Sequence, residues 1–137
     1  MNNAYHLGIN LGHDRSVAIV SDGEIKVAIQ QERLDRSKHS LGYLNQFMGD
    51  NTKIQLPWES IHYCLNELGI DLDELSSITA NMPGTDYSED ILKKALPQNS
   101  IEKIRVIPSH HLSHAYTAYW PSGFEESIVF SLMDLLF

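Results

Sequence analysis

Short apolar and β-branched segments, separated by polar turns, occupy the first thirty residues and predict three strands. The segments are His6–Asn10, Ser16–Ser21 and Glu24–Ile29. Asp22-Gly23 joins the second segment to the third, and this dipeptide is favoured in two-residue hairpin turns, where positive φ is needed. We therefore expect an antiparallel meander at the start of the chain.

The remainder of the chain alternates helical and strand patterns. Apolar residues recur at helical spacing between Pro57 and Gly69, which are typical start and stop residues. The segment 32–39 is highly charged and predicts an irregular loop. The other expected elements are strands over Leu75–Ala80, Lys103–Ile107 and Ser127–Met133 and helices over about Ser88–Leu96 and His111–Tyr119. The order β-β-β-α-β-α-β-α-β predicts an α/β fold of the ribonuclease-H-like kind, in which helices flank a mixed sheet.

Composition narrows the class of protein. A chain of 137 residues with 42% hydrophobic and 20% charged residues is typical of one ordinary globular domain. Ten Lys and Arg against eighteen Asp and Glu give a formal charge of −8, which argues against nucleic acid or a membrane as a partner. Cys64 is the only cysteine, so no internal disulfide can form. With no leader-like N-terminus and no apolar stretch near the roughly 20 residues of a membrane span, we expect a soluble, cytoplasmic protein.

A histidine-rich segment, His110-His111-Leu112-Ser113-His114, is the strongest chemical signal. On a helix, His110 and His114 project from one face about one turn apart, which suits two ligands of one metal ion. Asp134 is the candidate third ligand, because a carboxylate that ends an apolar run needs a compensating cation. Such a set suits iron, zinc or manganese. Alternatively, one histidine caps the helix and another is a hydrogen-bonded core residue.

The turn between the first two expected strands is a candidate anion site. Gly12 allows close backbone approach, and successive N–H groups in such a turn can bind phosphate. Asp14 and Ser16 complete the candidate cofactor-binding set here, and His13 adds a group that titrates near neutral pH. The alternative is an ordinary β-turn with a polar tip.

The charged loop that follows is a second candidate anion site. It presents Arg33, Arg36, Lys38 and His39 within seven residues, and the two guanidinium groups could clamp a phosphate or a carboxylate. The alternative is a solvated surface loop whose cations pair internally with Glu32 and Asp35.

Three blocks of sequence occur together and span nearly the whole chain. They are Gly8–Ala18 followed by Asp22-Gly23, then Gln31–His39, then His110–Ala115 with Ser122-Gly123-Phe124 and the strand that ends in Asp134. In this order they resemble the N-terminal part of the O-carbamoyltransferase family associated with nodulation factors and antibiotics. The resemblance implies an actin-like ATPase half-domain over residues 1–137.

The resemblance also implies a chemistry. It implies that His110, His114 and Asp134 ligate a divalent metal, iron first, with zinc or manganese as alternatives. It implies that His13 and Lys38 face the reacting carbamoyl adenylate and the acceptor hydroxyl. In the family, carbamoyl phosphate and ATP form that adenylate, and the carbamoyl group then passes to a sugar-like or small-molecule acceptor.

The sequence departs from the family pattern in two places. Gln30 and Gln31 precede Glu32 where the family shows consecutive glutamates, and residues 135–137 replace a glycine-rich phosphate turn. We therefore expect a truncated carbamoyltransferase that is inactive alone and needs the missing C-terminal portion or a partner chain. The alternative is a non-catalytic metal- or nucleotide-binding half-domain that works with a partner chain. The apolar last strand predicts a homodimer.

Overall fold

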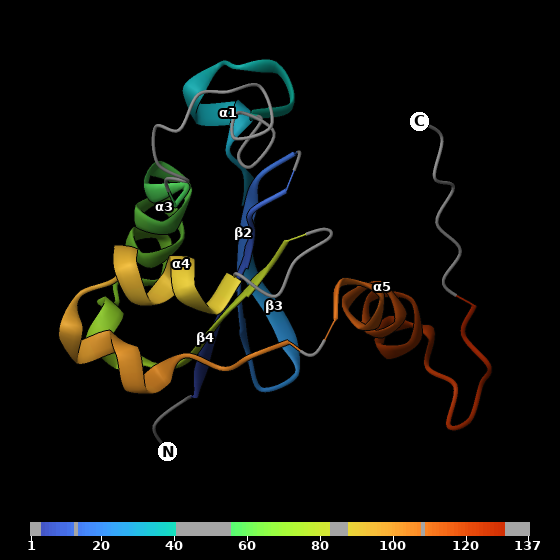
Figure 1. The fold of residues 1–137 in the computed structure, drawn as a ribbon. Coiled ribbons are helices and arrows are strands. Elements are labelled where there is room, and N and C mark those ends of the chain that lie inside the picture. Colours follow the sequence, from blue (N-terminus) through green and yellow to red (C-terminus); the bar gives the residue numbers. More distant parts are fainter. Residues whose placement is uncertain (1–3, 13, 41–55, 83–87, 108, 131–137) are drawn as a thin grey trace.

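A four-stranded mixed sheet forms the centre of the molecule (Figure 1). The computed structural model describes residues 4–12, 14–40, 56–82, 88–107 and 109–130. The strands are β1 (Tyr5–Asn10), β2 (Ser16–Ser21), β3 (Glu24–Gln30) and β4 (Leu75–Asn81), in the order β3-β2-β1-β4. Strands β1, β2 and β3 run antiparallel, whereas β4 lies parallel to β1. The expected meander and the expected α/β class are both confirmed.

Asp22 and Gly23 form the turn between β2 and β3, as expected. Their φ angles are 55° and 76°, so both central residues lie in the left-handed region that a type I′ hairpin turn requires.

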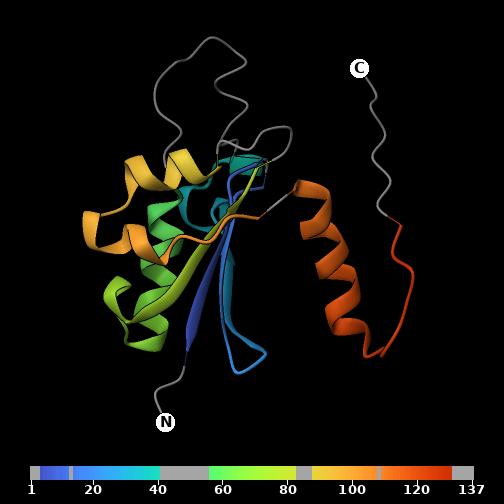
Figure 2. The same ribbon diagram turned by 60° about the horizontal axis from the view of Figure 1, so that its bottom comes forward.

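Helices lie on both sides of the sheet. α3 (Trp58–Leu68) packs on β2 and β3, and α4 (Ser88–Ala95) packs on β4, both on one face. α5 (His110–Tyr119) lies on the side of the opposite face (Figures 1 and 2). The remaining helical elements are α1 (Glu32–Asp35) and the 3-10 turns η1 (Lys38–Ser40), η2 (Leu72–Glu74), η3 (Gln98–Lys103) and η4 (Trp120–Ser122). No helix in the described ranges is long and apolar enough to cross a membrane.

Alternation along the strands places the core between the sheet and the α3–α4 layer. Inward-facing residues of the strands and apolar residues of the two helices are buried together, among them Leu7, Ile9, Val17, Ile19, Ile61, Cys64, Leu65, Ile78 and Leu92. The opposite face carries small and polar residues at the alternate positions, including Gly8, Asn10, Ala18 and Thr79. This second face therefore leaves room above the sheet on the side of α5.

Cys64 belongs to the core. Its side chain is fully buried, and burial, with a smaller contribution from the Glu67 carboxylate, raises the pKa of its thiol to about 11. The thiol therefore stays protonated at neutral pH, which fits a structural rather than a reactive cysteine.

Three sequence-based expectations about local structure are wrong. The expected strand Lys103–Ile107 is reduced to a single parallel bridge between Ile104 and Ile78. Lys103 ends η3, where its ammonium group donates to the backbone carbonyls of Leu72 and Asp73, at 3.1 and 2.6 Å. Val106 is already 56% exposed, so the chain leaves the sheet after one contact.

The expected last strand, Ser127–Met133, is not formed over residues 127–130, the part of it that the structure describes. Residues 127–130 form no ladder and are exposed, with Ile128 at 83% and Phe130 at 82%. An apolar run forms a strand only where a neighbouring strand accepts its backbone hydrogen bonds. The homodimer expectation relied on this strand and stays a prediction, since residues 131–133 lie outside the described residues.

The charged segment 32–39 is more ordered than expected. Carboxylates supply the local constraints: Glu32 accepts the backbone N–H of His39 at 3.0 Å, and Asp35 accepts that of Ser37 at 2.8 Å. Arg36 ends α1 in the left-handed region, with φ of 59°.

Candidate functional site

Two imidazoles face each other at the start of α5. Ser109 caps this helix, because its Oγ accepts the backbone N–H of Leu112 at 3.1 Å. The helix therefore includes His110, one residue earlier than expected. The Nε2 atoms of His110 and His114 lie 2.9 Å apart, with ring planes at 86°. Two nitrogens about 2.05 Å from one metal ion would lie about 2.9 Å apart at the right angles of octahedral coordination and about 3.4 Å apart in tetrahedral coordination. In the absence of a metal this contact is a hydrogen bond between the two rings, and its length also fits two adjacent ligands of one octahedral cation.

Asn81 holds the first of these imidazoles. Its Oδ1 lies 2.9 Å from Nδ1 of His110. Because an amide oxygen only accepts hydrogen bonds, Nδ1 carries the proton and the lone pair is on Nε2. This nitrogen is the one that faces His114.

A cavity of about 280 Å³ adjoins the histidine pair. Asn10, Gly12, Asn81, Ser113 and Thr117 line it together with the two histidines. Asn10 and Asn81 are partners in the β1–β4 register, so the ends of two parallel strands form its floor. Ligand sites in open α/β sheets are typically found outside the carboxyl ends of the strands.

A larger cavity of about 580 Å³ continues over the open face of the sheet. Its wall includes the small residues Gly8, Ala18 and Ala28, and also Ser16 and Arg33. The volume lies in the range of small-molecule sites. Two members of the predicted cofactor-binding set, Ser16 and Arg33, therefore line it.

The turn between β1 and β2 uses its backbone donors internally. The N–H of Leu11 donates to the Asn81 carbonyl at 2.8 Å, and that of Gly12 donates to Asn10 Oδ1 at 3.2 Å. The N–H of Asp14 donates to the His39 carbonyl at 2.7 Å. These three donors are thus engaged by protein atoms rather than directed at an anion. His13 lies outside the described residues.

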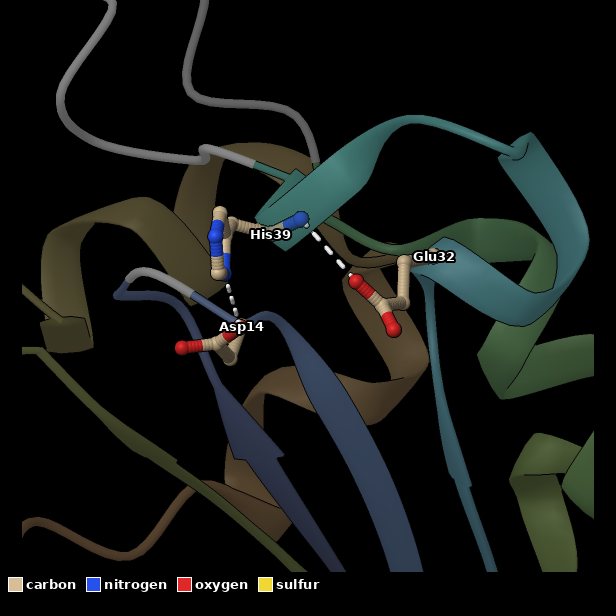
Figure 3. A group of neighbouring side chains, drawn as sticks. All are labelled: Asp14, Glu32 and His39. Carbon is tan, nitrogen blue, oxygen red and sulfur yellow. Dashed lines mark hydrogen bonds and ion pairs between the residues drawn. The ribbon is translucent and has the colours of Figure 1, made fainter.

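Asp14, Glu32 and His39 form a second cluster of candidate ligands (Figure 3). Nδ1 of His39 lies 2.9 Å from Asp14 Oδ1, and its backbone N–H donates to Glu32. One ligand atom from each of the three residues lies within 4.8 Å of the others. The existing hydrogen bonds give this cluster a structural role, because they join the turn after β1 to the charged loop. Sequence reasoning did not combine Asp14 with the two loop residues, because Asp14 lies 25 residues before His39 in the chain.

The basic residues of the loop, which were expected to form one anion site, do not line the same cavity. Arg33 lies 3.7 Å from Glu32 and lines the larger cavity. Arg36 and Lys38 are exposed, and within the described part of the chain no ion pair of either side chain is found. Asp134 lies outside the described residues, so the structure places two of the three predicted metal ligands.

Arg15 organises the loop, although its sequence context did not single it out. Its guanidinium group donates to the carbonyl and to the hydroxyl of Ser40, at 3.0 and 2.9 Å. The Ser40 hydroxyl donates to Asp35 at 2.6 Å. Burial raises the pKa of Asp35, but hydrogen bonds from Ser40 and Ser37, together with the neighbouring guanidinium, hold it below the ordinary value.

Asp35→Asn is expected to lower the free energy of unfolding by about 1–2 kcal/mol at pH 7. A lowered folded-state pKa stabilises the fold above the ordinary value of 3.8, and this contribution is lost as the pH falls through the folded-state pKa. Urea unfolding at pH 7 and pH 3 measures the difference, with the exposed Glu102→Gln as control. Equal loss at both pH values would contradict the role of the charge.

Together, these features define a mixed-sheet α/β domain with a histidine pair, a cavity beyond the ends of β1 and β4, and a larger cavity over the open face of the sheet. A family model described as carbamoyltransferase N-terminus matches residues 5–82, more than half of the chain. The chain belongs to the carbamoyltransferase N-terminus family.

Several proteins are similar to this chain over most of its length. Nodulation protein NolNO of Sinorhizobium fredii is 28% identical over 88% of this chain and 19% of its own length. The uncharacterized protein sll1178 of Synechocystis is 29% identical over 85% of this chain and 23% of its own length. MJ1051 of Methanocaldococcus jannaschii, also uncharacterized, is 30% identical over 92% and 21%. The chain thus spans about a fifth of the length of these relatives.

Among solved structures, an uncharacterized protein with similarity to peptidase YEAZ from Pseudomonas aeruginosa superposes with a TM-score of 0.49 and 13% identity. The match covers 85% of this chain and 49% of that chain.

Proposed function

We propose that this chain provides the metal-binding side of a carbamoyl-transfer site. The supporting observation is the 2.9 Å approach of the His110 and His114 nitrogens beside a cavity, in a chain of the carbamoyltransferase N-terminus family. The substrates would be carbamoyl adenylate, made from carbamoyl phosphate and ATP, and a sugar-like or small-molecule alcohol. Because the relatives are about five times as long, the remaining walls of the site would come from a further portion or a partner chain.

His110 and His114 would hold the cation, with Asp134 as the proposed third ligand. Iron is the first candidate, with zinc and manganese as alternatives. When bound, the cation supplies Lewis-acid chemistry that holds a phosphate or polarises a carbonyl group. The cavity over the open sheet face would accept the adenylate, where Ser16 offers a hydroxyl donor and Arg33 a cation.

The proposed transfer step is an acyl substitution. The acceptor oxygen forms a bond to the carbamoyl carbon, the bond from that carbon to the adenylate phosphate oxygen breaks, and AMP leaves. His13 is proposed to accept the hydroxyl proton, and Lys38 to face the developing negative charge. The exposed position of Lys38 on η1 leaves its ammonium group free to approach such a substrate.

A second candidate is a metal-binding half-domain without turnover that works with a partner chain. It is favoured by the turn after β1, where the N–H groups of Leu11, Gly12 and Asp14 are all engaged by protein acceptors. Such a turn offers fewer free donors to a nucleotide phosphate.

Metal titration of the purified chain tests the proposal. We expect one equivalent of Zn²⁺, Mn²⁺ or anaerobic Fe²⁺ to bind. His110→Ala and His114→Ala should weaken binding by more than the roughly 10–100-fold that an outer hydrogen-bond partner contributes. The exposed neighbour provides a matched control, because His111→Ala should bind as the wild type does. Equal affinity in all four proteins would remove the metal centre and the proposal with it.

Titration of the metal-loaded chain with AMP separates the two candidates. Binding that Arg33→Ala weakens would support a carbamoyl-transfer site. Intact metal binding with no affinity for AMP would favour the metal-binding half-domain.

A further inference from the structure

We propose that Asn81 is a positioning residue for the metal site, which acts through His110. The proposal rests on the proposed function, because it concerns the same histidine pair. The amide oxygen of Asn81 lies 2.9 Å from Nδ1 of His110, while Nε2 of the same ring faces Nε2 of His114 at 2.9 Å. The hydrogen bond to Asn81 thus leaves Nε2 of His110 as the nitrogen available to a ligand site.

The chemistry of the amide selects one tautomer of His110. A neutral imidazole has one protonated nitrogen and one lone pair, and a partner that can only accept keeps the proton on the nitrogen it contacts. The lone pair of His110 then resides on Nε2, so this ring needs no tautomer change before a cation binds, whereas His114 must move the proton that its Nε2 donates to His110. A hydrogen bond at Nδ1 also makes Nε2 more basic and restricts rotation of the ring.

Asn81 lies in the hydrogen-bonded sheet, which fixes the position of its backbone. It ends β4, next to the central strand β1, and lies opposite Asn10 in the parallel register. Its own carbonyl accepts the backbone N–H of Leu11 at 2.8 Å. Hydrogen bonds therefore hold the backbone of Asn81 in the sheet, and its side chain extends from this position to His110.

The helix that carries the histidines is less deeply packed than the sheet. None of the residues of α5 is buried, and among the described elements it packs mainly against the adjacent turn η4. Packing therefore constrains His110 less than it constrains a core side chain, and the hydrogen bond to Asn81 adds a direct link to the sheet.

Two substitutions separate positioning from mere folding. Asn81→Leu keeps the size of the side chain but removes the acceptor, and we expect Zn²⁺ affinity, measured against a competing chelator, to fall roughly 10–100-fold. Asn81→Asp keeps an acceptor and should bind Zn²⁺ at least as tightly as the wild type. Ser77→Ala, on the same strand, is the control and should leave the affinity unchanged.

Nitrogen NMR of the metal-free protein provides an independent readout. We expect the Nδ1–H tautomer of His110 in the wild type and in Asn81→Asp, and a mixture of tautomers in Asn81→Leu. If Asn81→Leu does not fold, Asn81→Ser replaces it, because the shorter hydroxyl side chain does not reach the ring in the same position.

The outcomes distinguish this proposal from the one on which it rests. Wild-type affinity in Asn81→Leu, together with loss of binding in His110→Ala, would overturn the role of Asn81 and leave the metal site intact. Equal weakening in Asn81→Leu and Asn81→Asp would also overturn it, because retention of an acceptor would then have no effect. Wild-type affinity in both Asn81→Leu and His110→Ala would remove the metal site itself.

Discussion

Replacing Gln31 with glutamate is expected to lower the free energy of unfolding by on the order of 3 kcal/mol at pH 7. Gln31 is 1% exposed, and its amide nitrogen donates to a Glu59 carboxylate oxygen at 2.7 Å. Its amide oxygen accepts from the Ser60 hydroxyl at 2.7 Å and from the Ser60 N–H at 3.2 Å. A glutamate keeps the acceptor but removes the donor, and two carboxylates would then face each other with little water.

The pH dependence of this loss has a definite sign. Repulsion raises the folded-state pKa of the new carboxyl group, so the loss is small below the unfolded-state pKa of about 4.3 and grows as the pH rises through the folded-state value. Urea unfolding between pH 4 and pH 8 measures it. Addition of Glu59→Gln to the same protein should restore most of the stability at pH 7, and Glu59→Gln alone is the control. A Gln31→Glu protein as stable as the wild type at pH 7 would contradict this account.

This position is also where the chain departs from the glutamates expected for its family. The structure gives a local reason for the departure, because Gln31 donates a hydrogen bond to Glu59, which a glutamate there cannot do. Glutamine at position 31 therefore provides the hydrogen bond that joins the end of β3 to the start of α3.

Ile78→Ala is expected to lower the free energy of unfolding by about 3–4 kcal/mol. Ile78 is fully buried in β4, beside Leu7 of β1 in the parallel register, and it also forms the bridge to Ile104. Loss of three carbon atoms there leaves a cavity between the sheet and α4 that close-packed neighbours fill only in part.

Guanidinium chloride unfolding provides the measurement, with two graded controls. Ile78→Val should cost only about 0.5–1.5 kcal/mol. Ile25→Ala, at a side chain that is 70% exposed in β3, should change stability by less than about 0.5 kcal/mol. Equal losses at positions 78 and 25 would show that the proposed core does not stabilise the fold.

The sheet could be predicted from the sequence wherever local patterns decide the structure. Alternation defines β1 and β2, Asp22-Gly23 defines the turn between β2 and β3, and helical spacing between Pro57 and Gly69 defines α3. In each case the residues that carry the signal are close together in the chain and bury one continuous face.

The segments whose structure was predicted wrongly depend on contacts with residues that the local sequence pattern does not reveal. Residues 103–107 and 127–130 are apolar enough for strands, but a strand also needs a neighbour along its whole length, and sequence patterns do not indicate where that neighbour lies. The order in segment 32–39 comes from hydrogen bonds such as that between Glu32 and the His39 N–H, which residue types alone do not indicate.

The candidate site likewise has one part that the sequence predicts and another that depends on contacts between distant residues. The i, i+4 spacing of His110 and His114 was readable because both lie on one helix. Asn81 lies 29 residues before His110, and the Asp14–His39 pair spans 25 residues, so only the folded chain brings these groups together.

The exposure of α5 has a consequence for local stability. A helix with no buried residue opens at lower free energy than the strands of the core, so its amide hydrogens should exchange with deuterium well before those of β1 and β2. A cation bound by both His110 and His114 would join successive turns of α5. It would slow exchange of the amide hydrogens there, with little change across the sheet. Deuterium uptake over residues 110–119 would then report occupancy of the centre without any assay of turnover.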